Sequence, residues 1–287
     1  MKIVLGREEV NPDKSDNDGR TQFSNAARNG HEGVMKILLG REDVNPGKPD
    51  NNGRTQRSFA SWEGHEGVVK ILLEREEVNM DKPDHDCRTP VVFAAQRGYG
   101  GVVKILLERE EVNLNKPDND GRTPLSHTAW EGHERVVKIL LRGAEVNRGK
   151  QDNDGRTPLS HAAWEGHEGV VEMLLEREGL NPDKLDNNDR TPLSFAAQNG
   201  REGVVEILLE QEEVNPDKPD NAGQTPLSYA ALYGREGVVS TLLRREEVNP
   251  NQPDNDCQTP LWYAAWTGHE RVVALLQSRK ARTPSTI

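Results

Sequence analysis

Residues 147–180 read NRGKQDNDGRTPLSHAAWEGHEGVVEMLLEREGL, and the threonine in this stretch returns along the chain every 34 residues. The residues at this register are Thr21, Thr55, Thr89, Thr123, Thr157, Thr191, Thr225 and Thr259. A glycine nine residues later keeps the same interval, from Gly30 to Gly268, without an insertion. A register kept so strictly identifies a repeat architecture, in which each unit buries its apolar side against its neighbours.

Each repeat carries the signals for two helices. In the stretch quoted above, Thr157 is a good helix N-cap, Pro158 suits the first helical position and Gly166 ends the short helix. Glu168 lies favourably at the positive end of a second helix, whose valines and leucines recur at helical spacing. Segments rich in Asn, Asp, Pro and Gly predict turns between repeats. We therefore predict an all-α solenoid of stacked helix-turn-helix units joined by hairpin-like loops.

The repeat register also predicts how the chain is divided. Residues 11–282 hold eight repeats of 34 residues, and residues 283–287 form a C-terminal tail. Residues 1–10 align with residues 35–44, so they correspond to the second half of helix 2 of a partial preceding repeat. Because the chain opens in the middle of a helix, we expect either a fragment or a gene product shortened by truncation.

The composition argues against several classes of protein. The chain has 287 residues, with 48 acidic against 37 basic side chains and a net charge of −11. This balance argues against a nucleic-acid partner, whose phosphates require a basic surplus. No stretch approaches the roughly 20 apolar residues that cross a bilayer, so we expect no membrane partner. Two cysteines are too few for a disulfide framework, which favours a cytoplasmic location, with the nucleus as the other compartment.

The sequence contains no arrangement that predicts catalysis. Five histidines precede a glutamate, namely His31, His65, His133, His167 and His269, but each lacks the second histidine of the His-Glu-x-x-His zinc motif. They recur once per repeat, about 10 Å apart if neighbouring helices pack at the usual distance, which is too far to share one metal ion. We interpret them as helix-start residues that tie adjacent repeats together. The expectation is no enzyme, no catalytic residues, no cofactor and no metal.

The repeat resembles the ankyrin repeat. The residues that carry the resemblance include Gly121-Arg122-Thr123-Pro124-Leu125, Ala162-Ala163, Gly166-His167, Val170-Val171 and Val146-Asn147. A tetratricopeptide repeat has a similar length, but its Trp-Leu-Gly and Tyr series cannot be laid on this chain. Two features depart from the family: each repeat is one residue longer than usual, and a serine replaces the histidine that usually follows Thr-Pro-Leu. This 34-residue variant resembles the ankyrin arrays of filamentous fungi.

The resemblance implies a non-catalytic protein–protein interaction scaffold. In this family, partners usually dock on the concave side formed by the hairpin tips and the first helices. Four of the five tryptophans share one register in that groove, and Trp and Tyr are enriched in binding hot spots. We therefore predict partner-binding residues at Trp62, Glu63, Trp130, Glu131, Trp164, Glu165, Tyr233 and Trp266, and at the hairpin residues Asn119, Asp120, Arg122, Asn153, Asp154 and Arg156. The predicted groove is centred on Trp130 and Trp164.

Two alternatives stay open at this point. The tryptophans have a second interpretation, in which each stacks, half buried, on the first helix of the neighbouring repeat. The function also has a second candidate, a sensor or regulatory arm truncated from a larger signalling protein, for example one with a nucleotide-binding domain. The chain is expected to be a monomer. Its acidic excess favours a partner with a basic patch, mainly through the association rate.

Some positions depart from the repeat pattern in ways that predict a local loss of stability. Arg57 stands where a leucine belongs, so a charged side chain points toward the core between repeats. Cys87, Asp189 and Cys257 replace a hairpin glycine, and if that position needs a positive φ, Asp tolerates it better than Cys. The residues at the register just before Ala-Ala, which in the second repeat is Ala60-Ser61, are expected in the core; they are Phe59, Phe93, Phe195, Tyr229 and Tyr263.

Overall fold

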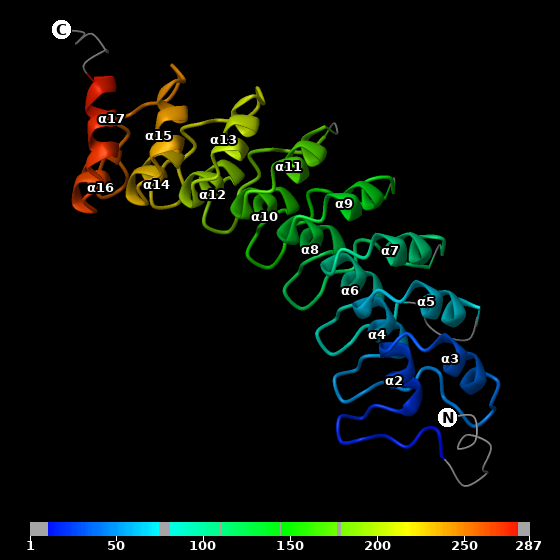
Figure 1. Cartoon of the computed structure of the whole chain (residues 1–287). Coiled ribbons are helices and arrows are strands. Elements are labelled where there is room, and N and C mark those ends of the chain that lie inside the picture. Colours follow the sequence, from blue (N-terminus) through cyan, green and yellow to red (C-terminus); the bar gives the residue numbers. More distant parts are fainter. Residues whose placement is uncertain (1–10, 75–80, 110, 144, 177–178, 281–287) are drawn as a thin grey trace. The chain divides into compact units, whose positions relative to one another are not determined.

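The computed structural model describes residues 11–74, 81–109, 111–143, 145–176 and 179–280. Within these ranges the chain forms sixteen α-helices and no β-strand. The helices come in pairs along the chain, a first helix that follows the repeated threonine and a second helix after a short turn (Figure 1). The predicted all-α repeat fold, built of helix pairs packed in sequence order, is confirmed.

The bounds of the helices repeat with the period of the sequence. The first helices are α2 (Gln22–Arg28), α4 (Gln56–Glu63), α6 (Pro90–Gln96), α8 (Pro124–Glu131), α10 (Pro158–Glu165), α12 (Pro192–Asn199), α14 (Pro226–Leu232) and α16 (Pro260–Trp266). The second helices are α3 (Glu32–Leu39), α5 (Glu66–Leu73), α7 (Gly100–Leu107), α9 (Glu134–Leu140), α11 (Glu168–Leu175), α13 (Glu202–Leu209), α15 (Glu236–Leu243) and α17 (Glu270–Lys280).

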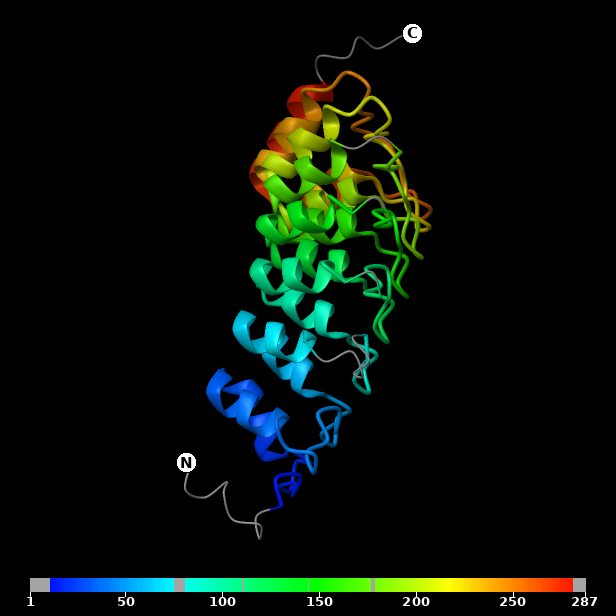
Figure 2. The same cartoon turned by 90° about the vertical axis from the view of Figure 1, so that its right-hand side faces the viewer.

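The described residues fall into two compact units. The first unit comprises the residues up to 128 together with 138–146, and the second comprises 129–137 together with the residues from 147 onward. In the first unit, α2, α4 and α6 pack in order, and so do α3, α5 and α7. In the second unit, the first helices from α10 to α16 and the second helices from α11 to α17 pack in the same way (Figure 2). The division into eight repeats over 11–282 stays a prediction, because residues 1–10 and 283–287 lie outside the described residues.

Buried threonine–serine pairs begin the first helices. Ser160 N donates a hydrogen bond to Thr157 Oγ1 at 3.2 Å, and Thr157 N donates to Ser160 Oγ at 3.2 Å. The same capping box occurs at Thr21 and Thr55. The serine that distinguishes this repeat from its family therefore satisfies backbone donors at the start of the helix. Thr89 makes no side-chain cap bond, and the valine at position 92 cannot supply the reciprocal serine bond. Thr259 keeps the first of the two bonds, because Trp262 N donates to its Oγ1 at 3.3 Å.

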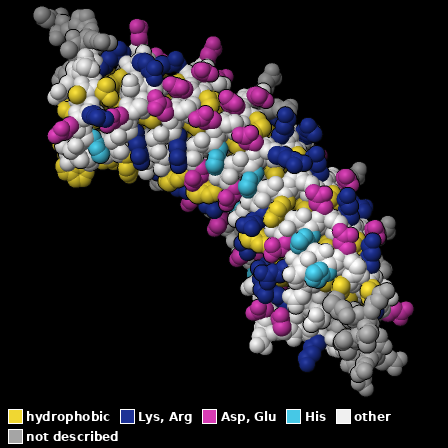
Figure 3. Space-filling view, viewed as in Figure 1, with side chains coloured by type: hydrophobic (Ala, Val, Ile, Leu, Met, Phe, Trp, Pro, Cys, Tyr) yellow, Lys and Arg dark blue, Asp and Glu magenta, His cyan; other side chains and the backbone are white. Residues whose placement is uncertain are grey.

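The core is formed by the apolar positions that the helical period predicts. In one repeat of the second unit, Ala162, Ala163, Val170, Val171 and Leu174 are all 0% exposed. The prediction that Phe59, Phe93, Phe195, Tyr229 and Tyr263 lie in the core is confirmed, because none of them is more than 9% exposed. Charged side chains instead spread over the face seen in Figure 3, with acidic and basic groups interspersed.

Arg57 is buried at the leucine position, as predicted. The residue is 2% exposed, and its Nη2 donates a hydrogen bond to the Leu72 carbonyl at 2.7 Å. Burial, together with the nearby charge of Arg109, lowers the pKa of the Arg57 guanidinium to about 10. The fold therefore tolerates one charged group in the apolar layer of the first unit by giving it a backbone acceptor.

The hairpins need a residue with a positive φ at one position. Gly155 has a φ of 80°, and a Cβ there would lie 2.7 Å from the backbone nitrogen of Asn187 in the next hairpin. Asn187 N also donates to the Asp154 carbonyl at 3.0 Å, so successive hairpins are hydrogen-bonded. The non-glycine residues at this position have the positive φ that the sequence suggested: Cys87 at 60°, Asp189 at 59° and Cys257 at 58°.

Candidate functional site

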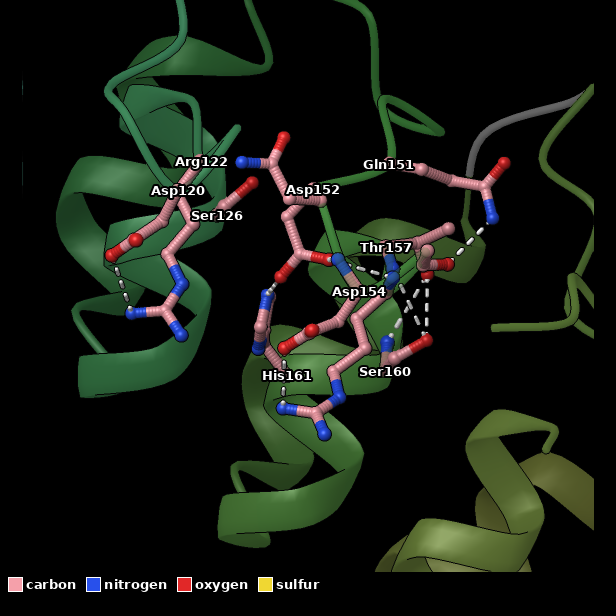
Figure 4. Close-up of polar contacts among 12 residues, drawn as sticks. Asp120, Arg122, Ser126, Gln151, Asp152, Asp154, Thr157, Ser160 and His161 are labelled. Atoms are coloured by element: carbon pink, nitrogen blue, oxygen red, sulfur yellow. Dashed lines mark hydrogen bonds and ion pairs between the residues drawn. The ribbon is translucent and has the colours of Figure 1, made fainter. Parts of the chain in front are cut away.

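A buried aspartate side chain holds most of the hairpins in shape, whereas the equivalent Asp16 of the first hairpin makes the same bonds but is exposed. The Oδ1 atom of Asp152 accepts hydrogen bonds from the backbone nitrogens of Asp154 at 3.0 Å and Arg156 at 2.8 Å (Figure 4). Equivalent pairs of bonds are made by Asp50, Asp84, Asp118, Asp186, Asp220 and Asp254. These bonds fix the backbone at the tip, where the predicted hairpin residues of the binding surface lie.

The other oxygen of this aspartate binds an arginine where the residue before Ala-Ala is phenylalanine. Arg190 Nε and Nη2 donate to Asp186 Oδ2 at 3.2 and 3.0 Å, and the guanidinium lies 4.5 Å from the ring centroid of Phe195. The same arrangement occurs at Asp50, Arg54 and Phe59 and at Asp84, Arg88 and Phe93. In these repeats the hairpin arginine is held between a buried carboxylate and an aromatic ring.

Where histidine occupies the same register, before Ala162-Ala163 or before Thr128-Ala129, it replaces the arginine at the buried aspartate. His161 Nε2 lies 2.9 Å from Asp152 Oδ2, within hydrogen-bonding distance (Figure 4), and His127 Nε2 lies 2.8 Å from Asp118 Oδ2. Arg156 then pairs with the exposed carboxylate of Asp154, at 3.5 Å. Burial by itself would raise the pKa of the Asp152 carboxyl, but hydrogen bonds from His161 and from two backbone N–H groups outweigh it and leave this pKa lowered.

Tyrosine at the same position binds the aspartate without any arginine. The Tyr229 hydroxyl donates to Asp220 Oδ2 at 2.6 Å, and the Tyr263 hydroxyl donates to Asp254 Oδ2. The hairpin position of the arginine is taken by Gln224 in the first of these repeats. Burial, and then the bond to the Asp220 carboxylate, raise the pKa of the Tyr229 hydroxyl.

Three of the four tryptophans in the shared register contact the next repeat. All three are half-buried. Their ring centroids lie 5.7 Å apart for Trp62 and Phe93, 5.4 Å for Trp130 and His161, and 5.3 Å for Trp164 and Phe195. The packing contact that the sequence offered as the second interpretation therefore exists, while each indole also keeps part of its surface exposed.

Trp266 differs from the other three tryptophans. It is 69% exposed, and its ring stacks on that of Trp262 with centroids 5.4 Å apart. Trp262 and Tyr233 are exposed as well, at 41% and 44%. The large exposed apolar side chains of the second unit therefore lie on α16 and directly after α14.

The predicted hairpin residues are exposed or partly exposed and are ordered by contacts within the protein. Asn119 Nδ2 donates to the His85 carbonyl at 3.1 Å, and Asp120 lies 4.0 Å from Arg122. In the second unit, the Asn153 carbonyl accepts a bond from Asn187 Nδ2 at 2.9 Å. These contacts hold the backbone of the tips and leave the ends of the Asn153 and Asp154 side chains at the surface.

The predicted glutamates are on the surface, and two of them are paired. Glu63 lies 3.4 Å from Arg28, Glu165 lies 4.0 Å from Arg201, and Glu131 is exposed. Arg156 joins the two groups of predicted residues in the second unit, because its guanidinium lies 5.4 Å from the ring centroid of Trp164. The hairpin prediction and the tryptophan prediction therefore meet at one surface there.

The predicted residues do not all lie in one compact unit. The first unit contains Trp62, Glu63, Asn119, Asp120 and Arg122, and the second contains Trp130, Glu131, Asn153, Asp154, Arg156, Trp164, Glu165, Tyr233 and Trp266.

A pocket in the first unit includes two of the predicted residues, Trp62 and Glu63, but its arginines were not predicted from the sequence. It has a volume of about 110 Å³ and is lined by four arginines, Arg20, Arg28, Arg54 and Arg88. A signal was present, since three of these arginines recur at the 34-residue interval four positions after the hairpin aspartate.

Two further findings concern metal ligation and membrane-spanning helices among the described residues. Among them, no group of three or more His, Cys, Asp or Glu side chains is arranged to hold a metal ion. A search of the same part of the chain finds no helix with the length and apolar character that spanning a membrane requires.

The comparisons with known proteins support the repeat pattern. A family model described as ankyrin repeats in three copies matches residues 1–84, 76–150, 144–220, 178–254 and 212–286. These overlapping matches run across nearly the whole chain. None of the curated proteins matches it.

Proposed function

Because the chain belongs to the ankyrin-repeat family, whose repeats are generally protein–protein interaction modules, we propose that it is a non-catalytic scaffold that binds a partner protein. The proposed binding surface is the concave groove formed by the hairpin tips and the first helices. Its centre is proposed in the second unit, at Trp130 and Trp164. The partner segment would lie across these indoles and contact the hairpin residues Asn153, Asp154 and Arg156.

The surroundings of Trp164 are the observation that carries this proposal. The indole is half-buried against Phe195, so its orientation is fixed before a partner arrives. Arg156 lies 5.4 Å from its ring centroid, and Glu165 follows it in the chain. An ordered aromatic ring beside an arginine is the combination that dominates binding hot spots, because it buries a large area at a low cost in side-chain entropy.

The remaining features of the partner are proposed from charge and composition. The net charge of −11 supports a partner with a basic patch, since opposite charges raise the rate of encounter. The small number of cysteines supports action in the cytoplasm or the nucleus, and we propose that the chain acts as a monomer.

The test compares two double variants. Trp130→Ala with Trp164→Ala removes both indoles, whereas Trp130→Phe with Trp164→Phe keeps an aromatic ring against His161 and Phe195. The partner is first recovered with the wild-type chain, identified by mass spectrometry, purified and titrated. We expect the alanine pair to lose at least about tenfold in affinity, the equivalent of one modest hot spot.

Thermal melting of the same proteins distinguishes binding from packing. A melting curve unchanged in the alanine pair, together with lost affinity, supports the groove. If the alanine pair unfolds while the phenylalanine pair keeps both stability and affinity, the indoles act in packing and the proposed groove is wrong.

A further inference from the structure

Four arginines converge on one pocket of the first unit. Arg20, Arg54 and Arg88 come from three successive hairpins, and Arg28 is the last residue of α2. The pocket has a volume of about 110 Å³. Figure 3 shows Lys and Arg side chains gathered beside α4 and α6. This local concentration of guanidinium groups contrasts with the net charge of −11 carried by the whole chain.

Two of these arginines are fixed in place by buried carboxylates. Arg54 Nε lies 3.0 Å from Asp50 Oδ2, and Arg88 Nε and Nη2 lie 3.1 and 2.9 Å from Asp84 Oδ2. The two aspartate side chains are 0% and 1% exposed, whereas the arginine side chains are 27% and 29% exposed. A guanidinium has five N–H donors, so the bonds to Asp50 and Asp84 orient the two side chains without using every donor. Arg88 Nη2 also lies 2.7 Å from the carboxylate of Asp86, whose side chain is 64% exposed, so a ligand at Arg88 has to replace that carboxylate. The pocket is therefore preorganised.

The ion pairs of the other two arginines are with carboxylates that are exposed or partly exposed, and one of these carboxylates, that of Glu63, itself lines the pocket. Arg20 lies 3.0 Å from Asp18, whose side chain is 65% exposed, and Arg28 lies 3.4 Å from Glu63, whose side chain is 32% exposed. Exposed ion pairs contribute little to stability. An incoming oxyanion can therefore replace the carboxylates of Asp18 and Glu63 at small cost.

Aromatic rings form the floor of the pocket. The guanidinium groups of Arg20 and Arg54 lie 5.8 and 5.1 Å from the ring centroid of Phe59, and that of Arg88 lies 5.1 Å from the centroid of Phe93. An apolar floor lowers the local dielectric and strengthens charge-assisted hydrogen bonds above it.

Several guanidinium groups around a small cavity match the geometry of a carboxylate or a phosphate. We infer that this pocket binds the oxyanion of an acidic side chain, a carboxylate or a phosphate, presented by the partner protein. The inference rests on the proposed scaffold function and names the chemistry that the first unit recognises. The basic patch proposed for the partner concerns its overall charge, whereas this pocket takes one acidic group.

The test uses three versions of one fluorescent alanine-based nonapeptide, with serine, phosphoserine or glutamate at the centre. Fluorescence anisotropy of the full chain at low ionic strength gives the three dissociation constants. We expect the phosphoserine or the glutamate version to bind at least about tenfold more tightly than the serine version, because only the charged groups form charge-assisted hydrogen bonds. The tighter of the two identifies the source of the oxyanion. Equal binding of all three peptides would overturn the inference.

Two opposite substitutions locate the effect. Arg28→Gln removes a pocket donor and is expected to weaken the tighter peptide about tenfold. Glu63→Gln removes the competing carboxylate and is expected to strengthen the binding of the same peptide. The matched controls are Arg244→Gln and Glu206→Gln, which alter an exposed pair in the second unit that is also 3.4 Å apart. Both controls should leave the affinity unchanged.

The outcomes separate this pocket from the proposed groove. If Arg28→Gln binds the peptides as the wild type does, the pocket assignment is wrong, whatever the partner protein does. If the peptides discriminate as expected while the indole pair of the second unit proves to act only in packing, the pocket stands and the groove centred on Trp130 and Trp164 is wrong. Circular dichroism melts confirm that each variant is folded.

Discussion

Two neighbouring repeats of the second unit satisfy a buried hairpin aspartate in different ways. Asp186 and Asp220 are equivalent hairpin aspartates, 5% and 9% exposed. Asp186 is satisfied by Arg190, which also lies over Phe195, whereas Asp220 is satisfied by the neutral hydroxyl of Tyr229. An arginine is therefore needed only where the residue before Ala-Ala has no polar group. The hairpin position and the helix position, five residues apart, have to be chosen together.

The largest expected effect comes from removing the arginine that pairs with Asp186. Arg190→Gln removes both donors to Asp186 Oδ2 and leaves a buried carboxylate without its counter-ion. We expect the free energy of unfolding to fall by about 3 kcal/mol, because breaking one partner of a buried pair costs more than the pair contributes. Urea denaturation measures the change.

Two further variants sharpen this first prediction. Adding Phe195→Tyr to Arg190→Gln recreates the combination found at Gln224 and Tyr229, and should recover more than half of the lost stability. Arg156→Gln is the matched control, since His161 already contacts the aspartate of that repeat and the ion pair of Arg156 is with an exposed carboxylate. The other contacts of Arg156 are with the rings of Trp164 and Phe195. If Arg156→Gln also lowered the free energy of unfolding by several kcal/mol, the arginine at Asp186 would not be special, and the prediction would be wrong.

A somewhat smaller effect is expected from removing the tyrosine hydroxyl that donates to Asp220. Tyr229→Phe removes the hydroxyl that donates to Asp220 Oδ2 at 2.6 Å and leaves Gln224 in the hairpin. The expected cost is about 2 kcal/mol, the penalty of one unsatisfied buried acceptor. Gln224→Arg in this background should restore the stability by copying the arrangement at Arg190. If Gln224→Arg stabilises the wild type as much as the variant, the two positions are not coupled.

The smallest expected effect is a difference between the wild type and Tyr229→Phe in how the free energy of unfolding depends on pH. Burial and the bond to Asp220 raise the pKa of the Tyr229 hydroxyl, so the folded state keeps its proton at a pH where the unfolded state loses it. The stabilisation is fully present below about pH 10 and is lost as the pH rises, by at most about 1.4 kcal/mol per pH unit. Tyr229→Phe should therefore show a shallower alkaline loss in urea denaturation. An identical slope in wild type and variant would contradict this assignment.

The sequence predicted the fold well, because the signals that form each repeat are local. Thr157 and Pro158 begin a helix through capping and a fixed φ, and Gly166 ends it, as observed. The role of the serine at position 160 was not predicted. Its bond back to Thr157 completes the cap, and the Thr-x-x-Ser spacing was the available signal.

The candidate site was less predictable, because contacts between repeats decide it. The shared register of the tryptophans pointed to a common surface, but the rings that Trp62, Trp130 and Trp164 contact belong to the following repeat. The same holds for the arginine pocket, where Arg28 approaches Glu63 across 35 positions of sequence. Side chains so far apart in sequence come together only through the stacking of helices.

The amino-acid sequence alone determined that this protein is an array of helix pairs, since a strict 34-residue period fixes which residues cap, turn and form the core. Only the tertiary structure decided how each buried aspartate is satisfied and where guanidinium groups gather. The physical reason is that capping and periodicity act within a few residues, whereas the desolvation of a charged group depends on every side chain packed around it.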